Sequence, residues 1–146
     1  MIDPNVRPAS TDDVAQLAWL EQRSRAALVG QRGGDRWLET HPERASAWQA
    51  AVVGGGVLVA HIDEVVVGYL VVAVRRRTAM VDDVFVLDEA RELGFGDALL
   101  AAALAHARVA GATLLEGEAL PGDRNTKNLY ERAGITARLI TVSTPL

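Results

Sequence analysis

The sequence contains no cysteine among its 146 residues. Disulfide bonds, thiolate metal sites and a cysteine nucleophile are therefore excluded. It also lacks an apolar run long enough to span a membrane, and its N-terminus has no basic stretch followed by an apolar one. From these absences we expect a cytoplasmic protein that does not associate with membranes.

Basic charge and histidine are also scarce. The formal net charge is -4, which argues against a general nucleic-acid binder, because such proteins carry a basic field. The three histidines, His41, His61 and His106, are scattered, and no two stand at a spacing typical of metal ligands on one helix. No serine lies in a glycine-flanked elbow, so a serine-histidine-acid triad is unsupported. We therefore predict no metal site and no hydrolase triad.

Apolar residues make up 49% of the chain and charged residues 23%, so it can bury a core and stay soluble. No repeat or long linker divides it, and we expect one domain over residues 1–146. Its periodicity and turn residues predict strands and helices in a definite order. Strands are predicted at 6–9, 57–62, 65–74, 79–87, 113–120 and 137–142, and helices at 10–29, 42–53, 97–109 and 123–132.

This order indicates a mixed α/β fold. Three consecutive strands joined by short turns predict an antiparallel meander, and the later strand-helix-strand unit predicts a parallel pair with a crossover. Helices should flank this central sheet. The glycine-rich stretch at 30–34 separates the first two helices and is predicted to be flexible.

The most informative motif is Arg91-Glu92-Leu93-Gly94-Phe95-Gly96, between an apolar strand and a helix. Glycines let a backbone approach a ligand closely, and a helix N-terminus offers free amides and a positive dipole end. The motif predicts a phosphate site made by the amides from about Leu93 to Asp97, with Arg91 as a cationic fork. The alternative is a tight turn with a small packing residue. A dinucleotide fold is disfavoured, because Leu99 replaces its third glycine.

The charge around this loop is unfavourable for phosphate. Four acids, Asp88, Glu89, Glu92 and Asp97, flank it, and Leu93 precedes the first glycine. Nearby acids weaken phosphate binding, so the loop binds its ligand modestly or binds a different one. Compensating charge is available on the later helix, from Arg124, Lys127 and Arg132.

With two further features, the chain resembles the GNAT superfamily of acyl-CoA N-acyltransferases. One is the strand Val81-Asp82-Asp83-Val84-Phe85-Val86 before the loop, and the other is Asn128-Leu129-Tyr130-Glu131-Arg132-Ala133-Gly134-Ile135 after it. The similarity extends from about Val57 to Ile135, while earlier residues match only in element order. Each motif alone is weak, and their order carries the resemblance.

The resemblance implies acetyl-CoA as acyl donor, with its pyrophosphate on the loop. It also implies that backbone groups of Val84, Phe85 and Val86 hold the pantetheine and the acyl carbonyl, and that Asn125 contacts the pantetheine. The chain departs from the family pattern nearby, with Asp123 and Thr126 where asparagine and alanine are frequent.

Tyr130 is then the predicted general acid, which protonates the departing thiolate. The alternative is a half-buried packing aromatic. Asp82 and Asp83 are candidates for the base that deprotonates the amine, and adjacent strand residues point to opposite faces. We favour Asp82 slightly; otherwise one acid is solvated and the other pairs with an arginine of Arg75-Arg76-Arg77.

The three tryptophans, Trp19, Trp37 and Trp48, all lie in the first third of the chain. They are expected to pack the early helices on the sheet. The alternative is a wall for the acceptor, with Gly30 to Trp37 as a lid.

The resulting prediction is transfer of an acetyl group from acetyl-CoA to a primary amine by direct attack in a ternary complex. Without cysteine the chain has no obvious acyl-enzyme nucleophile, which favours this route. The acceptor is a small-molecule or peptide amine, and a homodimer is compatible with the sequence. Two alternatives remain: a non-catalytic acyl-CoA sensor or interaction domain, and a transferase that uses the loop for another phosphorylated ligand.

Overall fold

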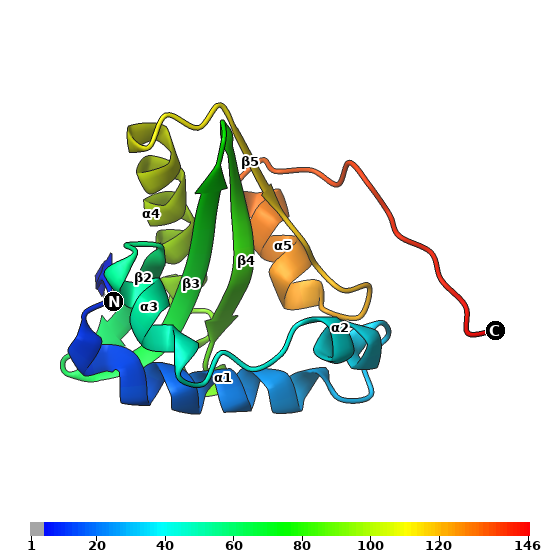
Figure 1. The fold of residues 1–146 in the computed structure, drawn as a ribbon, viewed down its shortest axis with the longest axis horizontal. Helices are drawn as coiled ribbons and strands as arrows, with labels where there is room; N and C mark the ends of the chain where they lie inside the picture. The colour runs from blue at the N-terminus through cyan, green and yellow to red at the C-terminus, as the bar shows by residue number, and fades with distance from the viewer. Residues whose placement is uncertain (1–4) are drawn as a thin grey trace.

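The computed structural model describes residues 5–146 and consists of one five-stranded sheet with helices on both faces (Figure 1). The sheet order is β1-β2-β3-β4-β5, antiparallel from β1 to β4 and parallel between β4 and β5. The expected meander and parallel pair are therefore confirmed. The strands are β1 Asn5–Pro8, β2 Val57–Ile62, β3 Val65–Arg75, β4 Thr78–Val86 and β5 Leu114–Gly117. The helices are α1 Val14–Leu28, α2 Gly34–Thr40, α3 Ala47–Val53, α4 Phe95–Val109 and α5 Arg124–Arg132.

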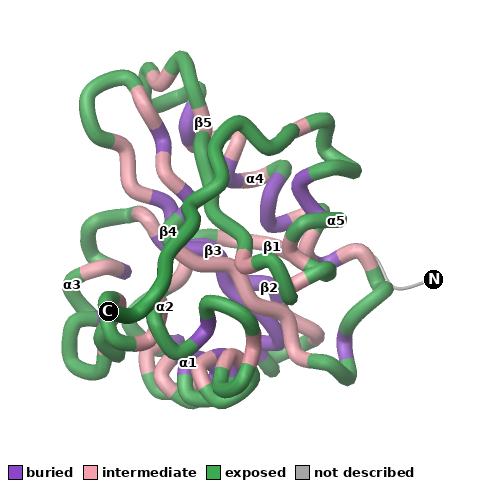
Figure 2. Tube along the Cα trace, turned by 90° about the vertical axis from the view of Figure 1, so that its right-hand side faces the viewer, coloured by how far each residue is buried: buried purple, intermediate pink, exposed green. Residues whose placement is uncertain are grey.

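Two apolar clusters fix the layers. On one face α4 and α5 pack on the sheet through buried residues such as Leu99, Leu100 and Leu129. On the other face α1 and α3 pack through Leu17 and Trp48. The buried part of the trace accordingly runs through the central strands and the inner sides of the helices (Figure 2). No helix among residues 5–146 is long and apolar enough to cross a membrane.

Four predicted elements differ from the structure, and one of them is the strand predicted at 113–120, which spans only Leu114–Gly117. The segment expected to be a flexible break continues into α2, which begins at Gly34. The next helix begins at Ala47 rather than at residue 42, because Arg44 leaves helical geometry to reach a buried carboxylate and Ala45 has φ 44°. The strand predicted at 137–142 is absent, since strand formers become a strand only when a neighbouring edge pairs with them.

A β-bulge in β4 sets the direction of the two acids. Val81 pairs with Val72 and Asp83 with Val71, so Asp82 is one extra residue in β4. The extra residue reverses the alternation of side chains beyond it. Val81 therefore faces the α4 side, whereas Asp83 faces the α1 side together with Tyr69.

Candidate active site

The glycine loop forms the expected helix entrance. Gly94 adopts φ 87°, a left-handed conformation that favours glycine, and caps α4. The first helical bond runs from the Ala98 amide to the Gly94 carbonyl over 3.0 Å. The amides of Phe95, Gly96 and Asp97 precede this bond and have no acceptor within the helix, and such free amides are suited to an anion.

Ion pairs neutralise most of the acidity around this loop. Three of its four acids contact arginines, and the pairs are Asp88–Arg91 at 2.8 Å, Glu89–Arg23 at 3.5 Å and Asp97–Arg132 at 3.0 Å. Exposed pairs add little stability, but each cancels a charge near the helix entrance. The local charge is therefore less unfavourable for phosphate than the four acids in the sequence suggest.

Two loop residues have further contacts. The Arg91 side chain also binds the end of β4, because its Nε donates to the Val86 carbonyl at 3.3 Å. A Cβ placed on Gly96 would lie 3.4 Å from Leu129 of α5, so this glycine also serves close packing of α4 and α5. Leu93 and Glu92 are exposed on the loop surface.

Next to the loop, β4 and β5 separate. Their pairing ends at Val81 and Gly117, so within residues 5–146 the rest of β4 pairs only with β3. The Leu87 amide donates to Val67 of β3, and successive strand residues alternate in direction. The amides of Val84 and Val86 therefore point to the free edge, while that of Phe85 points to β3. The sheet thus presents unpaired backbone donors in the gap between its last two strands.

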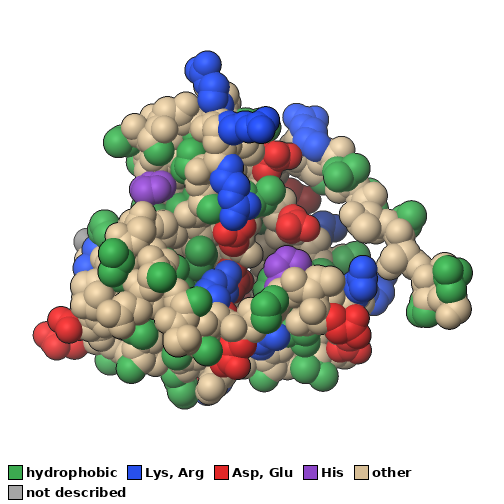
Figure 3. All heavy atoms as spheres, in the orientation of Figure 1, with side chains coloured by type: hydrophobic (Ala, Val, Ile, Leu, Met, Phe, Trp, Pro, Cys, Tyr) green, Lys and Arg blue, Asp and Glu red, His purple; other side chains and the backbone are tan. Residues whose placement is uncertain are grey.

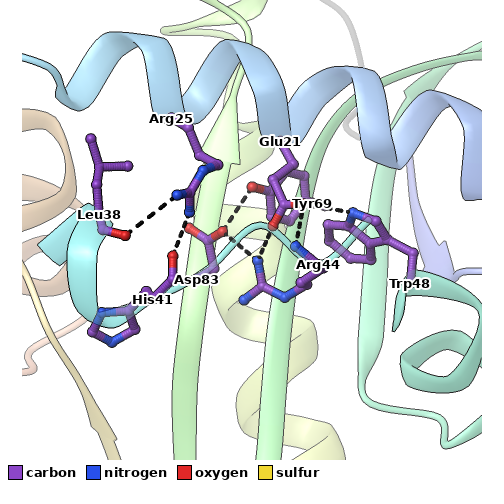
Figure 4. Close-up of polar contacts among 8 residues, drawn as sticks. All are labelled: Glu21, Arg25, Leu38, His41, Arg44, Trp48, Tyr69 and Asp83. Carbon is purple, nitrogen blue, oxygen red and sulfur yellow. Dashed lines mark hydrogen bonds and ion pairs between the residues drawn. The ribbon is translucent and has the colours of Figure 1, made fainter. Parts of the chain in front are cut away.

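Asp83 lies at the α1 side of this gap. Its Oδ2 accepts hydrogen bonds from Tyr69 Oη at 2.8 Å and from Arg44 Nη1 at 3.1 Å, as Figure 4 shows. No partner among residues 5–146 contacts Oδ1, and the side chain keeps 12% of its surface exposed. Burial raises the pKa of Asp83, and the charge of Arg44 partly opposes that rise. The geometry leaves one carboxylate oxygen available as a proton acceptor.

A buried carboxylate holds the arginine in place. Glu21 of α1 is 1% exposed and accepts bonds from Arg44 Nη1 at 2.7 Å, the Arg44 amide at 2.9 Å and Trp48 Nε1 at 3.1 Å. We call Glu21, Arg44, Tyr69 and Asp83 the carboxylate network. The alternative in which one of the two acids pairs with an arginine at 75–77 is wrong for Asp83, because its partner is Arg44. The sequence carried one signal for Glu21, since it shares the buried face of α1 with Leu17, Leu20 and Ser24.

Asp82, by contrast, is exposed at the bulge and lines a cleft of about 250 Å³. We call it the α2 cleft, and its lining residues are Arg25, Trp37, Thr40, His41, Pro42, Arg44, Asp82 and Glu118. Acidic side chains and a histidine gather around a hollow near the middle of the face in Figure 3. Neither Asp82 nor Glu118 forms an ion pair with a described residue.

One wall of the α2 cleft is formed by two stacked rings. Trp37 stacks on His41 with ring centroids 4.2 Å apart and planes 5° apart. Arg25 of α1 ties the end of α2 down by donating to the His41 carbonyl at 2.5 Å (Figure 4). Among the three tryptophans, only Trp37 lines the cleft, whereas Trp48 is core and Trp19 is half-exposed under Arg23. The proposed lid region is therefore largely a short helix with an aromatic face.

Tyr130 lies on the opposite side of the gap, on α5. It is 8% exposed, and a Cβ on Gly117 would overlap its hydroxyl group, so the phenol lies directly over the point where β5 leaves β4. Burial raises its pKa to about 12, with Asp83 and two further acids adding to the rise. The phenol therefore keeps its proton at neutral pH.

The unusual residues near α5 have a local role. Asp123 is the N-cap, and its carboxylate accepts from the Thr126 amide at 3.1 Å and from the Thr126 hydroxyl at 2.6 Å. Such a cap stabilises a helix start by about 1 kcal/mol. Asn125 is exposed in the first turn, so it is free to contact a ligand, and no described residue holds its side chain.

Several solved structures of other proteins have a similar fold. An aminoglycoside N-acetyltransferase, AAC(6')-Iy in complex with CoA, has a TM-score of 0.72 at 13% identity, covering 97% of this chain and 100% of that one. A ribosomal-protein-alanine N-acetyltransferase from Brucella melitensis biovar Abortus 2308 has 0.72 at 18% identity, covering 99% and 100%. The PaiA N-acetyltransferase from Thermoplasma acidophilum, in complex with coenzyme A, has 0.72 at 14%, covering 90% and 89%.

No curated protein sequence matches the chain significantly. The model of the acetyltransferase (GNAT) family, however, matches residues 12–135, which is most of the chain and includes the loop, the split strands and Tyr130. The structural neighbours share the fold, and the family match supplies the enzyme class. The chain belongs to the GNAT acetyltransferase family, and the predicted class of N-acetyltransferase is confirmed with it.

Proposed function

We propose that the protein transfers an acetyl group from acetyl-CoA to a primary amine by direct attack within a ternary complex. One observation carries the proposal: the gap between β4 and β5 has a free carboxylate oxygen on one side and a protonated phenol on the other. A base for the amine and an acid for the thiolate are the two proton-transfer groups that acyl transfer to an amine needs.

The donor would bind along the gap. The free amides of Phe95, Gly96 and Asp97 suit the CoA pyrophosphate, because a helix N-terminus favours anions. The outward amides of Val84 and Val86 suit the pantetheine and the acyl carbonyl. Neighbours of the same fold with CoA bound support acetyl-CoA as the donor.

The acceptor would enter through the α2 cleft. Asp82 and Glu118 give its rim negative charge, and neither forms an ion pair within residues 5–146, so the rim favours an ammonium group. An ammonium cannot attack, so it must lose a proton first. Asp83 Oδ1 is the group we assign to that step, directly or through one water, and its raised pKa makes it a better base than an ordinary aspartate.

The chemical step then proceeds by addition and elimination. The neutral amine attacks the thioester carbonyl carbon, and an outward β4 amide stabilises the oxyanion. The carbon–sulfur bond breaks, and its electron pair leaves with sulfur. Tyr130 donates its proton to that thiolate and regains one from solvent. Asp83 has by then passed the first proton to solvent, so it can take the second proton from the nitrogen, which gives an amide and free CoA.

The test is amine-dependent release of CoA, measured with a thiol-reactive dye. The chain has no cysteine, so the enzyme adds no background signal. We expect release with at least one class in a panel of polyamines, aminoglycosides, amino acids and peptide N-termini. Thermal stabilisation by acetyl-CoA without release for any amine would instead support a sensor domain. Stabilisation only by another phosphorylated compound would overturn both readings.

A further inference from the structure

Two exposed acids flank the point where β5 leaves β4 (Figure 1). Val81 and Gly117 are the last paired positions, so Asp82 and Glu118 are the next residue on each strand. Paired strands lie about 4.8 Å apart, so the two acids start from adjacent positions at the mouth of the gap. Both are exposed and both line the α2 cleft. We call them the mouth acids.

The mouth acids have no counter-ion among residues 5–146. The two arginines that line the cleft have other partners, because Arg44 lies between two acids of the carboxylate network and Arg25 donates to backbone carbonyls at the end of α2. Neither arginine forms an ion pair with a mouth acid. Like charges repel each other, and a bound cation removes that cost. The mouth of the gap is therefore suited to a cation.

An aromatic surface belongs to the same cleft. The stacked rings of Trp37 and His41 line it, and within residues 5–146 no arginine or lysine lies over either ring. The face of a tryptophan attracts an ammonium group, and the ring also offers apolar surface for methylene groups. Together the acids and the rings suit a cation carried on an aliphatic chain.

The reacting amine alone does not account for these groups. That amine must lose its charge at Asp83 before it attacks, and a neutral amine gains little from the mouth acids. A second amine that keeps its proton would interact with them throughout the reaction. The mouth is also close to the reacting groups, since burial and then the charges of Asp83 and Glu118 raise the pKa of Tyr130.

We propose that the acceptor is an aliphatic diamine or polyamine, whose reacting amine lies at Asp83 while the mouth acids hold a second ammonium group beside Trp37. The second charge fixes the chain in the cleft and so directs the other end to the base. This inference rests on the proposed function, because it names the class of acceptor for the same site.

The first experiment compares amines of equal length by release of CoA. Terminal diamines from diaminopropane to diaminooctane are each paired with the monoamine and the terminal amino acid of the same length. We expect at least one diamine to exceed its monoamine in kcat/KM by about tenfold, the size expected for a hydrogen bond between charged groups. Added salt should reduce this preference. Equal kcat/KM for diamine and monoamine, or a preference for the amino acid, would overturn the proposal and leave amine acetylation intact.

The second experiment removes the mouth acids one at a time. Asp82→Asn and Glu118→Gln should each lower the ratio of diamine to monoamine kcat/KM toward one, mainly through a higher KM for the diamine. Since both side chains are exposed, neither change should lower the melting temperature. Glu64→Gln, an exposed acid in the turn between β2 and β3, is the matched control and should keep the native ratio. A native ratio in both cleft variants contradicts the assignment.

Binding separates this inference from the proposed reaction. Calorimetric titration of diaminohexane and of hexylamine into the CoA-saturated protein involves no acetyl transfer. If no amine releases CoA, but the native protein binds the diamine more tightly than hexylamine and Asp82→Asn does not, the proposed reaction is wrong and the diamine site stands. If no amine releases CoA and the two amines bind equally or not at all, both proposals are wrong.

Discussion

The two sides of the β4–β5 gap are built by different physical means. Asp83 is held by hydrogen bonds and charge, through Tyr69, Arg44 and the buried Glu21 behind them. Tyr130 is held by packing, with its hydroxyl over Gly117 and no hydrogen bond to a described residue. The first side should respond to loss of charge and the second to added volume. Variants on the two sides should therefore behave differently.

Asp83→Asn should lower kcat/KM by about 10³-fold, within the range for a lost general base. Stability should stay equal or rise. The pKa of Asp83 is raised in the folded state, so the folded chain binds this proton more readily than the unfolded chain. The free energy of unfolding therefore falls as the pH rises above the pKa that Asp83 has in the unfolded chain. Asparagine carries no charge at this position, so it removes this loss of stability.

The measurements are a pH profile of kcat/KM and a thermal melt. The acid limb of the native profile should lie above the ordinary range of aspartate and should disappear in Asp83→Asn. Asp82→Asn, the exposed neighbour, is the control and should retain that limb. If Asp82→Asn removes the limb and Asp83→Asn does not, the assignment of the base is reversed.

Glu21→Gln should reduce the free energy of unfolding by about 3 kcal/mol, because it removes a buried charge that accepts three hydrogen bonds. Urea denaturation measures the change. Glu39→Gln, an exposed acid on α2, should alter stability by less than about 0.5 kcal/mol. Equal effects of the two variants would show that the carboxylate network does not support the fold.

Tyr130→Phe should lower kcat by about 10²-fold with little change in melting temperature. Since its pKa is about 12, the phenol stays protonated across the assay range. The ratio of native to variant rates should therefore be constant from roughly pH 6 to 10. A ratio that approaches one within this range would contradict a role of Tyr130 as general acid.

Gly117→Ala should lower kcat by about tenfold, because the added methyl group displaces the Tyr130 hydroxyl but leaves the phenol in the site. A double-mutant cycle sharpens this prediction. In the Tyr130→Phe background the hydroxyl is already gone, so the loss caused by displacing it should vanish, and only the effect of shifting the ring, whose Cζ would lie 2.6 Å from the added Cβ, should remain. Additive losses would mean that Gly117 acts on the backbone of β5 instead.

The motif part of the site was predictable from sequence. Residue types and their order along the chain indicate the turn at Gly94, the strand that carries Asp83 and the helix that carries Tyr130. The backbone roles of Val84 and Val86 were implied only by resemblance, and the split between β4 and β5 was not predicted, because backbone direction leaves no mark on side-chain identity. The same is true of the ion pairs that neutralise the loop, since Arg23 and Arg132 are distant from it in sequence.

The acceptor side was the least predictable. Arg44 and Glu21 are 23 residues apart, and nothing local pairs them. The helix α2 was missed because its glycine-rich start resembles a loop. The final strand was predicted from composition alone, and the structure leaves that segment without a neighbour in its own sheet. Local preference identifies what a segment favours, and tertiary pairing decides whether it forms.

The bulge at Asp82 has a consequence for comparing distant relatives. Because one inserted residue reverses the alternation of β4, the position of an acid along the strand does not determine which face it serves. A relative without the insertion would present the residue equivalent to Asp83 to α4 and would need its carboxylate one place earlier or later. Alignments of this strand should therefore be matched at the bulge, and they should allow the strand to have one residue more or fewer.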